Sequence, residues 1–74
     1  MKNKQTNILV TGGAGNIGTN LCKELCSRGH KVISSDLYNT ERDNYIRCDV
    51  RNYRQLQHVF DVFGPFDFVY HLAA

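Results

Sequence analysis

A glycine-rich turn near the start of the chain has residue types and a spacing that suit the binding of a dinucleotide pyrophosphate. Residues 11–18 read Thr-Gly-Gly-Ala-Gly-Asn-Ile-Gly, so Gly13, Gly15 and Gly18 satisfy the pattern G-x-G-x-x-G. Gly12 forms a second pattern with the last two glycines, spaced three and three. In such turns one glycine permits the tight exit from a strand, another lets the pyrophosphate approach the backbone, and the last lets a helix pack closely. Phosphate charge then meets free amides at the helix N-terminus, so no cationic side chain is required.

A carboxylate at the end of the next expected strand makes the pattern more specific, because a glycine-rich turn alone also occurs as a purely structural connection. Asp36 lies 18 residues after Gly18, where a carboxylate accepts hydrogen bonds from the adenosine ribose hydroxyls. Its negative charge would repel the 2′-phosphate of NADP, so we expect NAD as the cofactor. Two alternatives stay open: Arg42 in the same loop could swing toward a phosphate, and Asp36 could be a solvated loop residue or cap.

The elements that must position these residues alternate between strands and helices. Residues 8–10 form a short apolar run of the kind found in strands that are buried on both faces of a parallel sheet. In chain order, the expected elements are a strand at 8–10, a helix at 16–28, strands at 31–35 and 45–48, a helix at 52–63 and a strand at 66–71.

Apolar spacing and end signals support both helices. Along the first, Ile17, Leu21 and Leu25 recur every four residues, and Gly29 stands where a C′ glycine would end the helix. The second begins at Asn52, which resembles a capping box with Gln55, and stops at Gly64-Pro65. Its apolar face is marked by Leu56, Val59, Phe60 and Phe63.

The short connections imply parallel pairing through right-handed crossovers. We therefore predict an α/β fold: a partial, Rossmann-type parallel sheet of four strands in the order 3-2-1-4, with two main helices. No linker or repeat divides the chain, so residues 1–74 are expected to be the N-terminal part of a dinucleotide-binding domain, truncated before the rest of the fold. The strand at 66–71 would then be an exposed edge.

Composition narrows the class of protein. Apolar residues make up 42% and charged residues 22% of the 74 residues, as in ordinary folded soluble proteins. The net charge is only +2 and the basic residues are spread from Lys2 to Arg54, which argues against nucleic-acid binding. The apolar run at 8–10 is too short for a signal sequence or membrane span. Three cysteines without a C-x-x-C pair favour the reducing cytoplasm over a disulfide framework.

Several motifs in register resemble the extended short-chain dehydrogenase/reductase family, and within it the NAD-dependent epimerase/dehydratase branch. They are residues 11–18, Asp36, Asp49-Val50 and His71-Leu72-Ala73-Ala74. The resemblance covers nearly all of this chain but only about the first quarter of a typical member. It implies that Asn16 and Ile17 offer amides to the pyrophosphate, that Asp36 and Leu37 hold the ribose, that Asp49 and Val50 flank the adenine, and that Leu72, Ala73 and Ala74 line the cofactor further along. From the residues alone, Asp49 could equally cap the second helix.

The resemblance implies an enzyme that oxidises a nucleotide-sugar hydroxyl, holds the reduced cofactor and returns the hydride, and that works as a homodimer. Such enzymes use a Tyr-x-x-x-Lys pair, and none of Tyr38, Tyr45, Tyr53 and Tyr70 has a lysine four residues on. We therefore assign no catalytic residue and expect these 74 residues to be inactive alone. The alternatives are a catalytically silent NAD-binding sensor or interaction module and, less favoured, a flavin or S-adenosylmethionine site on a similar sheet.

Other candidate groups are given structural roles. Cys22, Cys26 and His30 are spaced by four, but Gly29 should end the helix before the histidine and no fourth ligand is evident, so no metal site is assigned. No proton-transfer role is assigned to His58 or His71. We expect the aromatic group Phe60, Phe63, Phe66 and Phe68 to be core rather than a stacking platform for nucleic acid.

Overall fold

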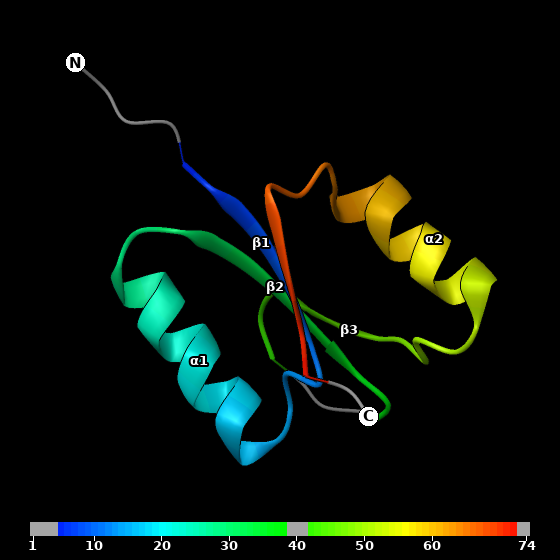
Figure 1. Cartoon of the computed structure of the whole chain (residues 1–74), viewed down its shortest axis with the longest axis horizontal. Coiled ribbons are helices and arrows are strands. Elements are labelled where there is room, and N and C mark those ends of the chain that lie inside the picture. Colours follow the sequence, from blue (N-terminus) through cyan, green and yellow to red (C-terminus); the bar gives the residue numbers. More distant parts are fainter. Residues whose placement is uncertain (1–4, 39–41, 73–74) are drawn as a thin grey trace.

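A computed structural model describes residues 5–38 and 42–72, which form a parallel sheet with one helix on each face (Figure 1). In chain order the elements are β1 (Asn7–Thr11), α1 (Asn16–Ser27), β2 (Lys31–Asp36), β3 (Tyr45–Arg47), α2 (Tyr53–Phe63) and β4 (Phe68–His71). In Figure 1 the sheet is seen from the β4 edge, with α1 on its left and α2 on its right.

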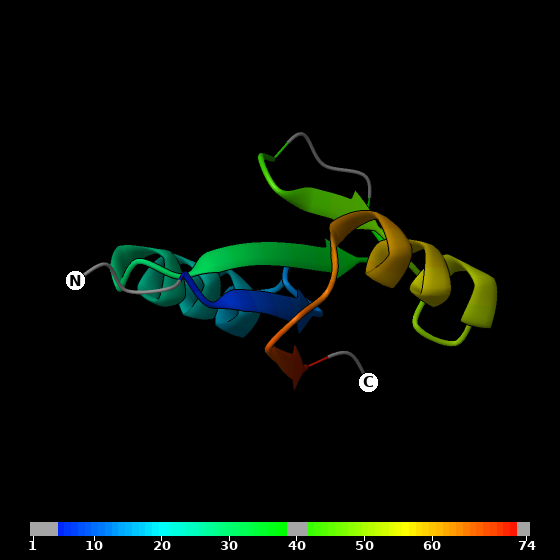
Figure 2. The ribbon, with the colours of Figure 1, turned by 90° about the horizontal axis from the view of Figure 1, so that it is seen from above.

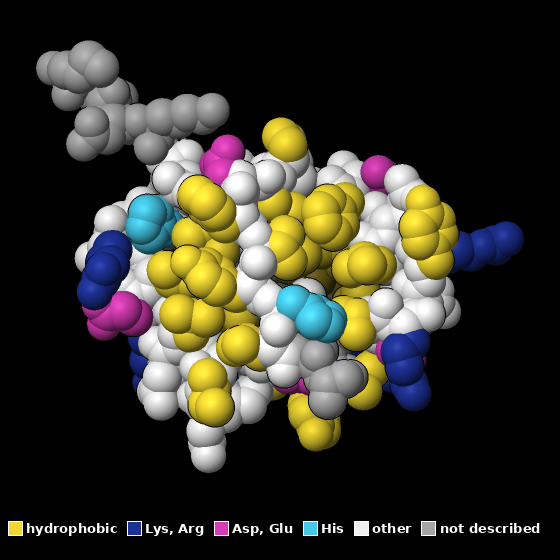
Figure 3. Space-filling view, viewed as in Figure 1, with side chains coloured by type: hydrophobic (Ala, Val, Ile, Leu, Met, Phe, Trp, Pro, Cys, Tyr) yellow, Lys and Arg dark blue, Asp and Glu magenta, His cyan; other side chains and the backbone are white. Residues whose placement is uncertain are grey.

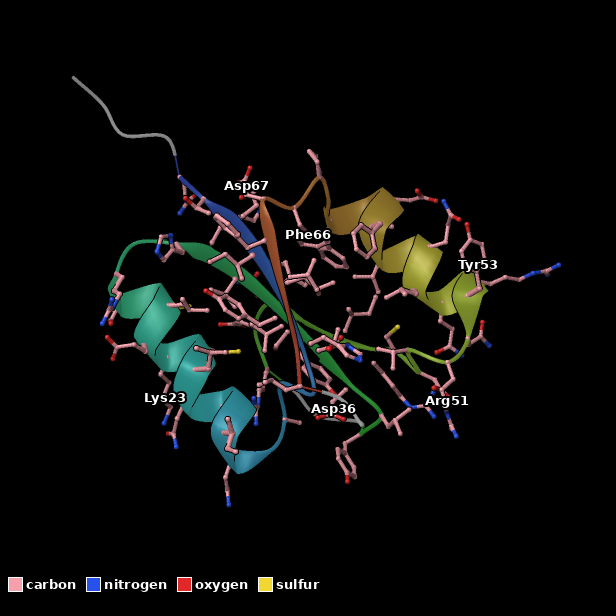
Figure 4. All side chains as sticks on the ribbon, in the orientation of Figure 1. Lys23, Asp36, Arg51, Tyr53, Phe66 and Asp67 are labelled. Carbon is pink, nitrogen blue, oxygen red and sulfur yellow. The ribbon has the colours of Figure 1, made fainter. Side chains whose placement is uncertain are left out.

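The strand order is β3-β2-β1-β4 and every pairing is parallel, which confirms the predicted sheet. Figure 2 shows the four strands side by side in this order. β4 begins at Phe68, two residues later than expected. The two preceding residues have other roles: Phe66 packs between the sheet and α2, and the Asp67 carboxylate accepts a hydrogen bond of 2.8 Å from the Asn7 amide (Figure 4).

Two apolar cores lie on opposite faces of the sheet, because side chains alternate along each strand. On the α1 face the buried cluster consists of Ile8, Val10, Leu25 and Val32, with Leu21 and Cys22 packed against it. On the α2 face it consists of Leu9, Ile33, Cys48 and Val59, joined by Ile46, Leu56, Phe63 and Phe66. Both central strands, β1 and β2, are therefore buried on both sides, as the continuous apolar run at residues 8–10 predicted for β1.

The ends of the helices follow the sequence signals with one difference. Gly29 has a φ of +89°, the left-handed conformation expected after α1. The Asn52 side chain caps α2 by accepting from the Gln55 amide at 3.2 Å. The Gln55 side chain, however, accepts from the Asp49 amide at 2.8 Å instead of returning to Asn52. The capping box is thus half formed, because Gln55 holds the connection from β3 instead.

Three side chains expected on apolar faces are exposed, so these predictions were wrong. Ile17 is 76% exposed because the first turn of α1 lies at the glycine-rich turn, where no buried strand residue packs against it. Phe68 is 60% exposed because β4 is the last strand of the sheet. Phe60 is 41% exposed and touches only the margin of the core, through an edge-to-face contact with Phe66 at 5.2 Å.

Hydrophobic side chains gather over the β4 edge and on both sides of it (Figure 3). All four residues of β4 are exposed, including Val69 and Tyr70, and the following Leu72 is 42% exposed. The predicted exposed edge is therefore present in the described residues. Neither helix in the described part of the chain has the length and apolar character needed to cross a membrane.

Candidate functional site

The glycine-rich turn connects β1 to α1 at the carboxyl end of the sheet, and three of its glycines are required by the turn itself. Gly12 has a φ of +74°, which side chains of L residues rarely adopt. A Cβ on Gly13 would lie 2.6 Å from the Ser34 Cβ. A Cβ on Gly18 would lie 2.3 Å from the Gly12 carbonyl oxygen and 2.7 Å from the Gly13 Cα, both backbone atoms. These positions allow α1 to approach the sheet closely, as the spacing predicted.

Gly15 has a different environment. Its φ of −76° is open to any residue, and a Cβ there would find its nearest neighbour 3.9 Å away, at the Gly12 carbonyl oxygen. Neither the backbone conformation nor the packing therefore requires a glycine at this position. The absence of a side chain leaves open space in front of the first residues of α1.

The N-terminus of α1 suits an anion in that space. Gly15 is the N-cap residue, so it supplies no side-chain cap, and the first turn contains no acidic residue. The first amides of a helix have no intrahelical acceptor and carry the positive end of its dipole. A hollow opens there, which we call the turn hollow, and it is lined by Gly12, Gly15, Asn16, Ile17, Gly18 and Leu72.

A second hollow, which we call the strand-end hollow, lies where β2 and β3 end. Its lining consists of Gly12, Asp36, Leu37, Cys48, Asp49, Val50 and Arg51. Figure 4 shows Asp36 at the end of β2 and Arg51 in the connection that leads to α2. Gly12 belongs to both hollows, so they adjoin at the carboxyl end of β1. In open parallel sheets this edge is where ligands bind.

Asp36 is tied to the backbone through both carboxylate oxygens. Oδ1 accepts from the Leu37 amide at 2.8 Å, and Oδ2 accepts from the Ala14 amide at 3.0 Å. The second bond joins the end of β2 to the glycine-rich turn. Because each carboxylate oxygen has two lone pairs, further hydrogen bonds from a ligand remain available on the side that faces the strand-end hollow.

Asp49 holds its carboxylate against Arg51 rather than against α2. The guanidinium donates from Nε to Oδ1 and from Nη2 to Oδ2, each at 3.0 Å. These hydrogen bonds and the Arg51 amide lower the pKa of Asp49, and the same pairing raises the pKa of Arg51. Since Asn52 provides the side-chain cap of α2, the alternative role of Asp49 as that cap was wrong.

Arg42 makes contacts that its sequence position did not suggest. Its Nη1 donates to the Gly13 carbonyl oxygen at 3.1 Å and its Nη2 donates to the Thr19 hydroxyl at 3.0 Å. The side chain thus lies on the glycine-rich turn and α1, and it lines a hollow with Cys22 and Lys23 rather than the one that contains Asp36.

Two further groups lie close to the expected site. Cys48 is among the residues that line the strand-end hollow, and burial is the main cause that raises the pKa of its thiol, with a smaller contribution from the Asp49 charge. At the ends of β1 and β4, the Thr11 hydroxyl and His71 Nδ1 are 2.8 Å apart. Neither the place of Cys48 nor the contact between Thr11 and His71 could be predicted from sequence spacing, because each depends on which strands are neighbours.

The structure places most of the expected cofactor residues around the two hollows. Gly13 lines neither hollow. Ala73 and Ala74 fall outside the described residues. Within residues 5–38 and 42–72, no three His, Cys, Asp or Glu side chains are grouped as metal ligands would be.

Comparison with known proteins identifies the family. A sequence model described as the NAD dependent epimerase/dehydratase family matches residues 8–74. The chain belongs to this family. It is 35% identical to a UDP-glucuronic acid decarboxylase of Arabidopsis thaliana over 99% of this chain and 17% of the relative. With an ADP-L-glycero-D-manno-heptose-6-epimerase of Cupriavidus pinatubonensis it shares 36% identity over 90% of this chain and 23% of the relative.

The fold comparison agrees with the family. A crystal structure of Thermus thermophilus UDP-glucose 4-epimerase in complex with NAD matches with a TM-score of 0.80 and 36% identity. The match covers 93% of this chain and 24% of the epimerase. This member of the NAD-dependent epimerase/dehydratase family thus spans about a fifth of the length of the curated relatives named above, 17% and 23%.

Proposed function

We propose that the two adjoining hollows together bind NAD. The observation that carries this proposal is the open space at Gly15, which lies directly in front of an α-helix that begins without a side-chain cap. A protein that used this turn only as a connection could carry a Ser, Thr, Asp or Asn at this position, whose side chain would cap the helix and stabilise it by a few tenths of a kcal/mol more than glycine does. Open space and free amides favour an anionic ligand instead.

The residues of the hollows would divide the cofactor between them. The amides of Asn16 and Ile17 at the start of α1 would receive the pyrophosphate. Asp36, with Leu37, would hold the adenosine ribose, and the segment from Asp49 to Val50 would flank the adenine. Leu72, with Ala73 and Ala74, would line the part of the cofactor beyond the pyrophosphate. The adjoining positions of the hollows support this assignment, since one extended ligand could occupy both.

NAD rather than NADP is the cofactor that we propose, for two reasons. A 2′-phosphate would meet the Asp36 carboxylate, whose negative charge faces the strand-end hollow. The cation nearest in sequence, Arg42, is already bonded to the Gly13 carbonyl oxygen and the Thr19 hydroxyl. Pairing with a 2′-phosphate would require it to leave both.

For the whole protein, we propose a nucleotide-sugar-converting enzyme of the cytoplasm. The names of the two curated relatives, one acting on a UDP-sugar acid and the other on an ADP-heptose, support the substrate class, and three free cysteines support a reducing compartment. Bound NAD would supply hydride acceptance and return. The described residues would bind and orient it, and none is assigned proton transfer, so we expect no turnover from these 74 residues alone.

Calorimetric titration of the chain with NAD and NADP tests the proposal, with Asp36→Ala and Asp36→Asn as variants. We expect NAD to bind more tightly than NADP and Asp36→Ala to weaken NAD binding. Asp36→Asn keeps the size of the side chain but removes its charge, so it should reduce the difference in affinity between NAD and NADP. Asp61→Ala, at an exposed position of α2, is the matched control and should change neither affinity.

Two outcomes would contradict the proposal. One is the absence of NAD binding by a chain whose circular dichroism shows it to be folded, which would leave the glycine-rich turn with a structural role. The other is a wild-type preference for NADP, which would overturn the role of Asp36.

A further inference from the structure

Opposite charges hold the two ends of one peptide group in the glycine-rich turn. The carbonyl of Gly13 accepts from the Arg42 guanidinium at 3.1 Å. The amide of the next residue, Ala14, donates to the Asp36 carboxylate at 3.0 Å. The carbonyl and the amide belong to the same planar peptide unit, so these two bonds together fix its orientation.

Arg42 makes two hydrogen bonds to the turn and α1, and their two acceptors also contact each other. The guanidinium donates through Nη1 to Gly13 and through Nη2 to the Thr19 hydroxyl at 3.0 Å. The Thr19 hydroxyl itself lies 3.4 Å from the Gly13 carbonyl oxygen. A planar guanidinium offers two donors in a fixed fork, so it can reach both acceptors at once, whereas an ammonium cannot match this geometry.

The turn needs external ties of this kind because a glycine lies on each side of Ala14. Gly13 and Gly15 lack the Cβ that restricts other residues, so a free turn would sample several peptide orientations. The direction of the amides that follow, those of Asn16 and Ile17 among them, depends on the orientation of this peptide. If the peptide is already held in one orientation before the ligand arrives, binding loses less conformational entropy.

We propose that Arg42 is a positioning residue for the turn: with Asp36 it clamps the Gly13–Ala14 peptide, and it thereby prepares the following amides for the pyrophosphate. This inference rests on the proposed function, that the turn binds NAD. It assigns Arg42 no contact with the ligand. Arg42 therefore supports NAD and NADP binding equally, unlike a residue that pairs with a 2′-phosphate.

Titration of Arg42→Ala and Arg42→Lys with NAD and NADP tests the clamp. Arg42→Ala weakens the binding of both cofactors by the same factor, about tenfold, which corresponds to about 1.4 kcal/mol of binding free energy. Arg42→Lys recovers part of the affinity, because its ammonium reaches one acceptor. Arg54→Ala, an exposed arginine on α2, is the control and leaves both affinities unchanged. A loss confined to NADP, or no loss for either cofactor, overturns the clamp.

Amide hydrogen exchange provides a readout that does not depend on binding. In Arg42→Ala the Ala14 amide exchanges faster, while the Ile33 amide in β2 keeps its protection. Thr19→Val removes one acceptor of the guanidinium and serves where Arg42→Ala does not fold; it shows the same selective change at Ala14. Unchanged exchange at Ala14 in both variants refutes the clamp. A wild-type chain with protected Ala14 but no NAD binding refutes the proposed function and leaves the clamp standing.

Discussion

Replacing Gly15 by alanine separates the binding role of the turn from its structural role. The added Cβ would have its nearest neighbour at 3.9 Å, an ordinary contact, and the φ of −76° suits alanine. Nothing in the fold therefore opposes Gly15→Ala. The methyl group would, however, occupy the space in front of the first amides of α1, where we propose the pyrophosphate.

The expected change in stability is close to zero because two small effects oppose each other. Removing a glycine restricts the unfolded chain, which stabilises the fold by about 0.4–1 kcal/mol where the conformation is allowed. Gly15 is also the N-cap residue, and alanine is a worse N-cap than glycine by roughly 0.5–1 kcal/mol. The free energy of unfolding should thus stay within about 0.5 kcal/mol of the wild-type value.

Gly18→Ala is the matched comparison because it changes the same turn in the opposite way. Its Cβ would meet backbone atoms at 2.3 Å and 2.7 Å, which cannot rotate away. Overpacking of this kind costs about 1–3 kcal/mol, and the gain from replacing a glycine inside a helix is only about 1 kcal/mol. Because both clashes are with backbone, we expect the cost to lie near the upper end of this range and the net loss to be about 2 kcal/mol.

Urea unfolding followed by circular dichroism measures the stabilities, and calorimetry measures NAD binding by the folded variants. Hydrogen bonds to charged groups contribute about 1.5–3 kcal/mol each, so losing one in Gly15→Ala should weaken NAD binding by at least tenfold. Gly15→Ala should therefore be stable but weakly binding. Wild-type affinity in a stable Gly15→Ala chain would refute the placement of the pyrophosphate, and an unchanged stability of Gly18→Ala would refute the packing argument.

Three other predictions concern side chains around the sheet. The buried Ser35 hydroxyl has no hydrogen-bond partner in the described residues, so Ser35→Ala should raise the unfolding free energy by about 1 kcal/mol in urea titrations; a loss would indicate a missed partner. Iodoacetamide should label exposed Cys26 first and Cys48 last, since burial protects Cys48 and raises its pKa; equal rates by mass spectrometry would contradict its burial. Pairing with Arg51 lowers the pKa of Asp49, so it stabilises the fold at pH values above 3.8, the ordinary pKa of this group. That stabilisation is lost as the pH falls through the lowered pKa. Arg51→Gln should therefore lower the urea midpoint at pH 6 but not in strong acid, and a deficit that persists in acid would exclude this linkage.

The sequence predicted the sheet well because its signals are local. A strand buried on both faces needs apolar residues on both sides, which gives continuous runs such as residues 8–10. Gly29 ends α1 for an equally local reason, its φ of +89°. Once strands and helices alternate with short connections, the handedness rule leaves few arrangements, and the order 3-2-1-4 follows.

Exposure at the margins of the sheet could not be predicted in the same way. Periodicity tells which residues share a face of an element, but it does not tell what lies opposite that face. Ile17 continues the stripe of Leu21 and Leu25 but has no buried core residue against it, and Phe68 belongs to the last strand of the sheet. For the same reason the bond from Arg42 to Gly13, 29 residues apart, has no sequence signal.

The bond between Asp36 and Ala14 links the two hollows energetically as well as in space. Asp36 is the residue that we propose for the ribose, and Ala14 lies in the turn that we propose for the pyrophosphate; their side-chain to backbone bond spans 22 residues. If ribose binding orders the carboxylate, it also steadies the turn, and the pyrophosphate must favour the same carboxylate position, because coupling between sites is reciprocal. The loss on replacing Asp36 therefore contains a contribution from the pyrophosphate site. The Asp36 and Gly15 substitutions should then be non-additive in NAD affinity, as expected for groups that act through a shared backbone segment.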